Sequence, residues 1–182
     1  MHSLRKILIV TMGPALLLAT LTSCSEGETK AVPKLPDRIC WGAFASKGIT
    51  PLLPTGEEAT LDTDPFSLIE GLDAATCSTY IDGNIQFQAT ATRRDFENEI
   101  EWSSYEKGET DPVDVGKRAI VWPGGAIGYI VCEPSKSPSA PGNYVELSIN
   151  TFDAPDDKRA RSAASELLKE FAEFAQRELK CA

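Results

Sequence analysis

The sequence predicts an α+β domain, in which an antiparallel sheet of about four to five strands packs against one long C-terminal helix. Three observations indicate this class. Apolar and polar residues alternate between about residues 77 and 152, turn sequences separate these runs, and the period becomes helical after Asp156. Widely spaced cysteines in the same region predict two disulfides that stabilise the fold.

The chain begins with a leader, residues 1–23. The basic pair Arg5-Lys6 precedes an apolar run over 7–21, which suits a signal peptide better than a membrane span of about 20 apolar residues. The leader closes at Leu21-Thr22-Ser23-Cys24, which resembles the lipobox of bacterial lipoproteins. In that family the signal peptide is cut before the cysteine, which then carries lipid. The resemblance implies lipidation of Cys24.

An ordinary secretory signal peptide is the alternative reading of the leader, but it would not require Leu, two small residues and Cys in this order. With more than one acyl chain, Cys24 would hold the protein stably on the membrane, because a single chain binds only marginally. Residues 24–36 are polar and contain two prolines, so we expect a flexible tether. Residues 37–182 then form a single extracytoplasmic domain on the cell membrane.

Charge and composition narrow the possible partners. The chain has 27 acidic and 18 basic residues and a net charge of −9, which argues against nucleic acid and anionic lipid surfaces. The single histidine, His2, lies in the leader. A mature protein without histidine has no Ser-His or Cys-His catalytic pair and no His-ligated metal, so we expect no cofactor and no metal.

Cys40, Cys77, Cys132 and Cys181 remain after Cys24, and their spacing contains no C-x-x-C pair. An even number of cysteines in an exported chain indicates two disulfides, for which three connectivities exist. Sequential connectivity favours Cys40 with Cys77 and Cys132 with Cys181.

The elements follow in chain order. Residues 37–46 suggest a short helix, whereas most of 55–75 has no clean period and stays unassigned. Asp82-Gly83 predicts a tight hairpin between strands over 77–81 and 84–92, the second of which alternates apolar and polar residues. One face of this hairpin should be buried and the other wet.

A second hairpin is expected where residues 118–122 turn through Pro123-Gly124-Gly125 into 126–133, and residues 144–152 alternate as a last strand. From about Asp156 to Lys180 the apolar residues form one helical stripe, which should pack on the sheet. Acidic residues at the start of this segment suit the positive end of a helix dipole.

The chain beyond the leader resembles the small secreted lipoproteins of unknown function that are common in actinobacteria. The resemblance rests on Cys40-Trp41, on Cys77 and Cys132 in strands, and on a terminal helix that ends Leu179-Lys180-Cys181. It covers most of residues 37–182 and implies fold and location only. It supplies no catalytic residue.

Two features carry candidate binding chemistry. Carboxylates alternate with large apolar residues from Asp95 to Trp102, so a strand here would present Asp95, Glu97, Glu99 and Glu101 to a cation or a cationic peptide. The alternatives are a solvated strand face or a helix. An exposed Trp122 beside a turn is suited to anchoring a glycan or protein, although a tryptophan in this position more often packs across the hairpin.

The sequence therefore favours a non-enzymatic, lipid-anchored module that binds an envelope protein or a cell-wall component. One rival is a hydrolase that attacks envelope polymers through paired carboxylates, although nothing in the sequence fixes two of them at the required separation. Another is a cation-binding or small-ligand-binding lipoprotein.

Overall fold

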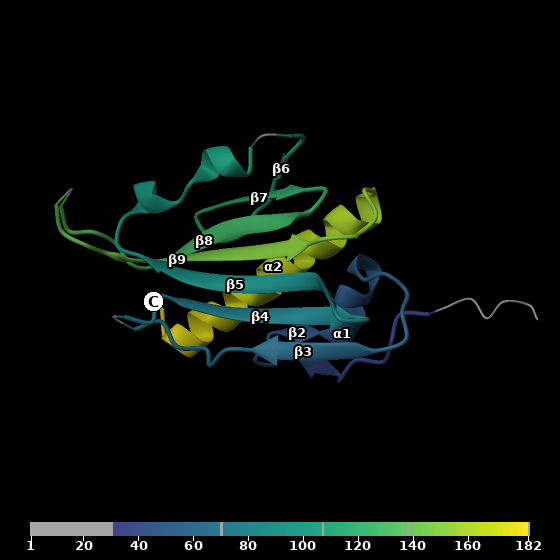
Figure 1. The fold of residues 1–182 in the computed structure, drawn as a ribbon. Coiled ribbons are helices and arrows are strands. Elements are labelled where there is room, and N and C mark those ends of the chain that lie inside the picture. The colour runs from purple at the N-terminus through teal and green to yellow at the C-terminus, as the bar shows by residue number, and fades with distance from the viewer. Residues whose placement is uncertain (1–30, 70, 107, 138, 182) are drawn as a thin grey trace, which may run out of the picture.

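A computed structural model describes residues 31–181 of the chain, apart from residues 70, 107 and 138. Cys24 and the leader therefore lie outside the described residues. The fold is α+β, as expected, with an antiparallel sheet and a long C-terminal helix, α2 (Lys158–Leu179), that runs diagonally behind the strands (Figure 1). Among the described residues, no helix has the length and apolarity needed to cross a bilayer.

The sheet contains seven strands in the order β3-β4-β5-β9-β8-β7-β6, rather than the expected four to five. The five central strands come from the segments that the sequence assigned to strands, namely β4 (Ala74–Ile81), β5 (Asn84–Arg94), β7 (Arg118–Trp122), β8 (Gly125–Glu133) and β9 (Asn143–Thr151). The edges are β3 (Ala59–Thr63) and β6 (Asp111–Pro112). Both edge strands are largely exposed, so their sequences carry no alternation of burial.

The expected hairpins are present. Asp82 and Gly83 connect β4 to β5 with φ angles of 49° and 79°, which is the left-handed geometry that a tight primed turn requires. A β-bulge between Thr79 and Tyr80 interrupts the pairing of these strands. Pro123 and Gly124 connect β7 to β8, and the carbonyl of Gly124 accepts a hydrogen bond of 2.8 Å from the backbone N–H of Thr151.

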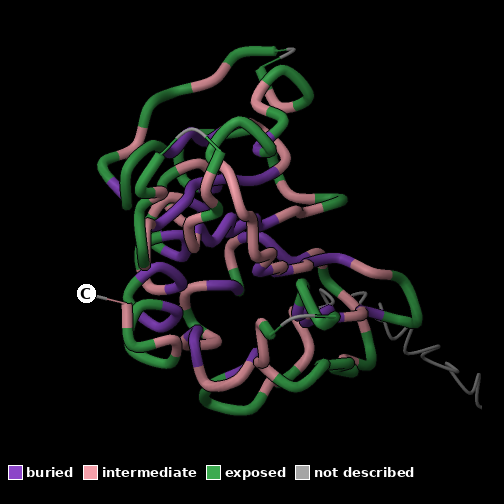
Figure 2. Tube along the Cα trace, turned by 90° about the vertical axis from the view of Figure 1, so that its left-hand side faces the viewer, coloured by how far each residue is buried: buried purple, intermediate pink, exposed green. Residues whose placement is uncertain are grey.

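Interactions at each terminus of helix α2 determine where it begins and ends. The carboxylate of Asp157 caps it by accepting a hydrogen bond of 2.8 Å from the N–H of Ala160, and Lys180 ends it in the left-handed conformation. The buried stripe packs on the inner face of the sheet and consists of Ala160, Ala164, Leu167, Leu168, Phe171, Ala172, Phe174 and Ala175. Figure 2 shows the buried positions gathered in the interior of the molecule.

Residues 37–46 do not form the expected short helix. They form a hairpin of β1 (Arg38–Ile39) and β2 (Phe44–Ala45), followed by α1 (Ser46–Ile49) and a 3₁₀ turn, η1 (Thr50–Leu52). The reason is local, since Cys40, Trp41 and Gly42 all have positive φ, between 50° and 80°, which a right-handed helix excludes.

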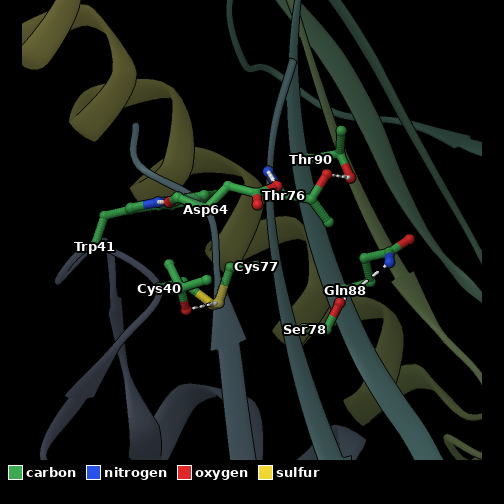
Figure 3. Close-up of a disulfide and its surroundings, with 9 residues drawn as sticks. Cys40, Trp41, Asp64, Thr76, Cys77, Ser78, Gln88 and Thr90 are labelled. Carbon is green, nitrogen blue, oxygen red and sulfur yellow. Dashed lines mark hydrogen bonds between the residues drawn. A yellow bond between two sulfur atoms is a disulfide. The ribbon is translucent and has the colours of Figure 1, made fainter. Parts of the chain in front are cut away.

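Both expected disulfides are present, Cys40 with Cys77 and Cys132 with Cys181. The first ties the β1–β2 hairpin to β4, and the second ties β8 to the second residue after α2. Trp41 packs beside the first disulfide, with its ring 5.0 Å from Phe66 and 5.8 Å from Phe171, and its indole N–H donates to the carbonyl of Asp64 at 2.6 Å (Figure 3).

The described chain already contacts the domain before residue 37. The carbonyl of Ala31 accepts a hydrogen bond of 3.1 Å from the N–H of Gly56, and Val32 and Leu35 pack against the core. The end of the segment that we expected to be a tether therefore lies against the folded domain.

Candidate functional site

The sheet face that points away from α2, here called the outer face, carries two kinds of surface. Side chains alternate between the faces of a strand, so Cys77, Ala89 and Ile149 meet the helix while their neighbours point outward. Over β4, β5 and β9 these neighbours are polar. Over β8 and β7 they are apolar and aromatic, and a loop over residues 95–110 packs against them.

We call the first part the polar platform. It is built of hydroxyl and amide side chains that the strand register places in adjacent rows, and it comprises Thr76, Ser78, Gln88, Thr90, Thr92, Ser148 and Asn150. One row runs Ser78–Gln88–Asn150 and the next runs Thr76–Thr90–Ser148. Every member is uncharged, so the platform offers hydrogen-bond donors and acceptors without formal charge.

Few hydrogen bonds within the platform use this capacity. The amide of Gln88 donates to the hydroxyl of Ser78 at 3.2 Å, and the hydroxyls of Thr76 and Thr90 lie 3.5 Å apart (Figure 3). Figure 3 also shows Ser78 on the side of β4 opposite to the Cys40–Cys77 disulfide. The same strand thus carries the core on one side and the platform on the other.

Gln86, two residues before Gln88 in β5, differs from the platform residues in its position in the sheet. It is the extra residue of the β-bulge, opposite no residue of β4, and only 6% of its surface is exposed, yet its side-chain Oε1 accepts no hydrogen bond from the described residues. A buried amide oxygen without a donor costs about 1–3 kcal/mol. Because this oxygen has less than 1 Å² of exposed surface, a ligand on the sheet does not reach it in this conformation.

The second part of the outer face forms a small core of its own. Ile120, Ile127, Tyr129 and Tyr144 are buried there together with Ile100 of the 95–110 loop, and Trp102, Tyr105 and Trp122 pack around them. This apolar contact explains why the loop lies on the sheet although it contains only two short 3₁₀ turns, η2 (Glu97–Glu99) and η3 (Trp102–Ser104).

Polar contacts fix the loop further. The hydroxyl of Tyr129 donates to the Glu97 carboxylate, and Arg118 lies 4.1 Å from the ring centre of Trp102 while its guanidinium pairs with Glu106 at 2.5 Å. Burial, and then the hydrogen bond to Glu97, raise the pKa of Tyr129 above the ordinary tyrosine value.

An aromatic wall stands beside the polar platform. The ring of Tyr105 lies 5.3 Å from that of Trp122, and Trp122 occupies the strand row that continues through Gly125 to Asn150. Burial, and then the Glu146 carboxylate, raise the pKa of Tyr105. Glu146 is itself buried on the outer face and pairs with Arg94 at 2.8 Å.

The expected acidic strand face does not exist. Residues 95–101 fold as irregular chain with the 3₁₀ turn η2, and Ile100 is buried in the small core of the outer face while Phe96 is only partly buried. The four carboxylates therefore separate. Asp95 pairs with Arg93, Glu97 accepts from Tyr129, Glu99 accepts from the N–H groups of Asp95 and Phe96, and Glu101 accepts from Ser103.

Glu97 does line an open hollow of about 540 Å³, together with Phe96, Asn98, Ile100, Trp102 and Arg118. Within the described part of the chain, no group of three or more histidine, cysteine or carboxylate side chains is placed to hold a metal ion. In this hollow Glu97 is already paired with the Tyr129 hydroxyl, and Arg118 lies over Trp102.

Trp122 is half-buried, and its contacts are those of packing across the hairpin. Its ring packs over the turn, since a Cβ atom added at Gly125 would lie only 3.1 Å from Cζ2 of the indole. The same ring contacts Tyr105 and borders the platform. The sequence singled out Trp122 but missed Tyr105 and the platform, although alternation of Gln86, Gln88, Thr90 and Thr92 was a visible sign of the wet face.

No family model matches the chain, and neither the curated proteins nor the solved structures yield a match. The fold and the outer face define a disulfide-stabilised α+β domain with an open, uncharged sheet surface beside an aromatic wall. Its function has to be argued from that surface.

Proposed function

We propose that this protein is a lipid-anchored, extracytoplasmic binding module, and that the outer face of its sheet is the binding surface. The observation that carries the proposal is the polar platform, a set of uncharged side chains on the outer face of which Thr76, Gln88, Thr90, Thr92 and Asn150 are partly exposed. Its hydroxyl and amide groups bind by hydrogen bonding and do not titrate near neutral pH, which favours recognition over acid–base catalysis.

Two disulfides support export, because such bonds persist in oxidising compartments and are rare in the cytosol. Anchoring at Cys24 rests on the lipobox resemblance. Ala31 is the seventh residue after Cys24, so a lipid on Cys24 would keep Ala31 within about 25 Å of the membrane surface.

This short distance would keep one end of the domain near the membrane. The carbonyl of Ala31 accepts a hydrogen bond from the Gly56 N–H, and the neighbouring Glu57 N–H donates to the carboxylate of Asp82 in the β4–β5 turn, so this end of the sheet lies beside the attachment segment.

The anchor is tested by fractionation of cells that produce Cys24→Ala. The variant should leave the membrane fraction and appear in soluble form, because only the lipid holds the acidic domain there. If Cys24→Ala remains wholly with the membrane, the lipid anchor is wrong.

The binding surface is tested with Thr90→Arg, which places a long charged side chain in the middle of the platform. Ser162→Arg is the matched control, because it makes the same change on the exposed side of α2. Full-length protein with Thr90→Arg should bind a purified envelope fraction at least about tenfold more weakly, whereas Ser162→Arg should bind like the unchanged protein. Equal binding by both variants would overturn the proposal.

A further inference from the structure

We propose that the ligand of the polar platform is an uncharged polysaccharide chain, bound along the strands against the wall of Tyr105 and Trp122. This inference rests on the proposed function and adds the chemical class of the ligand. It follows from the hydrogen-bonding groups, the charge and the aromatic border of the platform.

The hydrogen-bonding groups match sugars. Sugar hydroxyls and acetamido groups both donate and accept, and the platform offers the same balance through Thr and Ser hydroxyls and through the amides of Gln88 and Asn150. Gln88, Thr90, Thr92 and Asn150 are only partly buried, so a sugar that lies on the sheet can reach their side chains.

The charge of the surface excludes polyanions. None of the platform side chains is basic, and the charged residues that the register places beside it on the outer face include the carboxylates of Asp62 and Glu146, the latter paired with Arg94. The whole chain carries a net charge of −9. A phosphate-rich or uronic-acid polymer would be repelled, whereas an uncharged chain would not.

Aromatic side chains lie at two borders of the platform, where they can contact the faces of sugar rings. Tyr105 and Trp122 border the β9 side of the platform, and Tyr80 lies on the outer face at the β4 side, paired with Thr60 of β3. Aromatic rings cover the apolar C–H faces of sugars while their polar tips stay in water. The two borders leave a floor between them that is three strands wide, about 10 Å from β4 to β9.

The same floor is poorly suited to a protein partner. Stable protein interfaces depend on apolar and aromatic anchors that fill desolvated pockets, and the floor carries none between its borders. Its length suits a polymer, because from Gln88 to Thr92 it extends about 13 Å along β5. An extended glycan would cross several rows of hydroxyl and amide groups.

The test uses full-length protein in detergent and a panel of soluble glycans. The uncharged probes are chitohexaose, cellohexaose and mannohexaose, and hyaluronan is the charged probe. We expect binding of at least one uncharged probe and none of hyaluronan. Gln88→Leu removes the amide but keeps the size of the side chain, and it should weaken binding about tenfold. Gln176→Leu makes the same change on the exposed side of α2 and should have no effect.

Thr90→Val provides a second test if Gln88→Leu folds poorly, because a β-branched side chain suits the strand and only the hydroxyl is lost. Absence of binding to every uncharged glycan would overturn the inference, and so would binding that both platform variants leave unchanged. If no glycan binds but Thr90→Arg still abolishes binding to the envelope fraction, the outer face is a binding surface and its ligand belongs to another chemical class. If no glycan binds and Thr90→Arg binds the envelope fraction like the unchanged protein, the proposed function is wrong.

Discussion

Tyr105 and Trp122 meet ring to ring, with their centres 5.3 Å apart and their planes at 45°. One residue belongs to the 95–110 loop and the other ends β7, so the contact holds the loop beside the polar platform. These contacts hold the 95–110 loop in place although it contains no long strand or helix, and its Tyr105 ring borders the platform together with Trp122. The consequences of this arrangement can be measured separately for stability and for binding.

Removal of the wall should affect both properties. Trp122→Ala should lower the free energy of unfolding by about 1–3 kcal/mol, because the ring is half-buried against Tyr105 and the turn. It should also weaken binding to the envelope fraction. Trp122→Phe keeps an aromatic ring and should retain most of the binding. Urea unfolding and the binding assay check this, and unchanged binding by Trp122→Ala would show that the wall has no part in recognition.

The ion pair of Arg94 and Glu146 should matter more than surface pairs. The Glu146 side chain is only 8% exposed, so Arg94→Met would leave a carboxylate buried without its partner. We expect a loss of about 1–3 kcal/mol in the free energy of unfolding, less than for a fully buried pair because Arg94 is one third exposed.

Arg177→Met is the control for that measurement. Arg177 pairs with Glu178 at 3.6 Å on the open surface of α2, and such pairs contribute little. A chemical denaturation series should therefore separate the two variants clearly. Equal stability of Arg94→Met and the unchanged protein would mean that water reaches Glu146 on the outer face.

The second disulfide should stabilise the end of α2. Cys132 and Cys181 are 49 residues apart, so replacement of both by serine should cost about 4 kcal/mol, mainly by freeing the unfolded chain. Denaturation in the absence of reductant measures the loss, and peptide mapping under the same conditions should link the two cysteines directly. Recovery of Cys132 linked to Cys77 would contradict the connectivity.

We expect the ionisation of Tyr129 to make the free energy of unfolding depend on pH in the alkaline range. Its pKa is raised in the folded protein, by burial and by the hydrogen bond to Glu97, relative to about 10 in the unfolded chain. The folded state therefore holds the phenolic proton longer, and this contribution is fully present below pH about 10 and is lost as pH rises above it.

Tyr129→Phe should remove that alkaline loss. The variant should be less stable near neutral pH by about 1 kcal/mol, because the hydrogen bond to Glu97 is gone, and its stability should fall less steeply above pH about 10. Urea midpoints across this range test the prediction. Parallel pH profiles for the two proteins would show that Tyr129 ionises as it does in the unfolded chain.

Much of the fold is predictable from the sequence because its signals are local. The positive φ angles of the β4–β5 turn follow from Asp82-Gly83, and the apolar stripe after Asp156 predicts α2 and the face that it buries. Both disulfides follow from an even number of cysteines joined in sequence order.

The features that escaped prediction depend on contacts distant in the chain. The β1–β2 hairpin replaces a helix because three successive residues adopt positive φ around the Cys40–Cys77 disulfide, which local propensity does not indicate. The alternation from Asp95 to Trp102 suggested a strand, but burial of Ile100 on the outer face decides the path of this segment. Tyr105 joins the site only because the loop folds back over β7 and β9.

Crosslinking in intact cells tests the central claim most directly. A photo-crosslinking residue at position 88 would stand on the polar platform, and one at position 176 would stand on the exposed side of α2 at a site that also holds glutamine. The account predicts a reproducible envelope adduct from position 88 and none from position 176. Equal adducts from both positions, or adducts from position 176 alone, would contradict a binding surface on the outer face of the sheet.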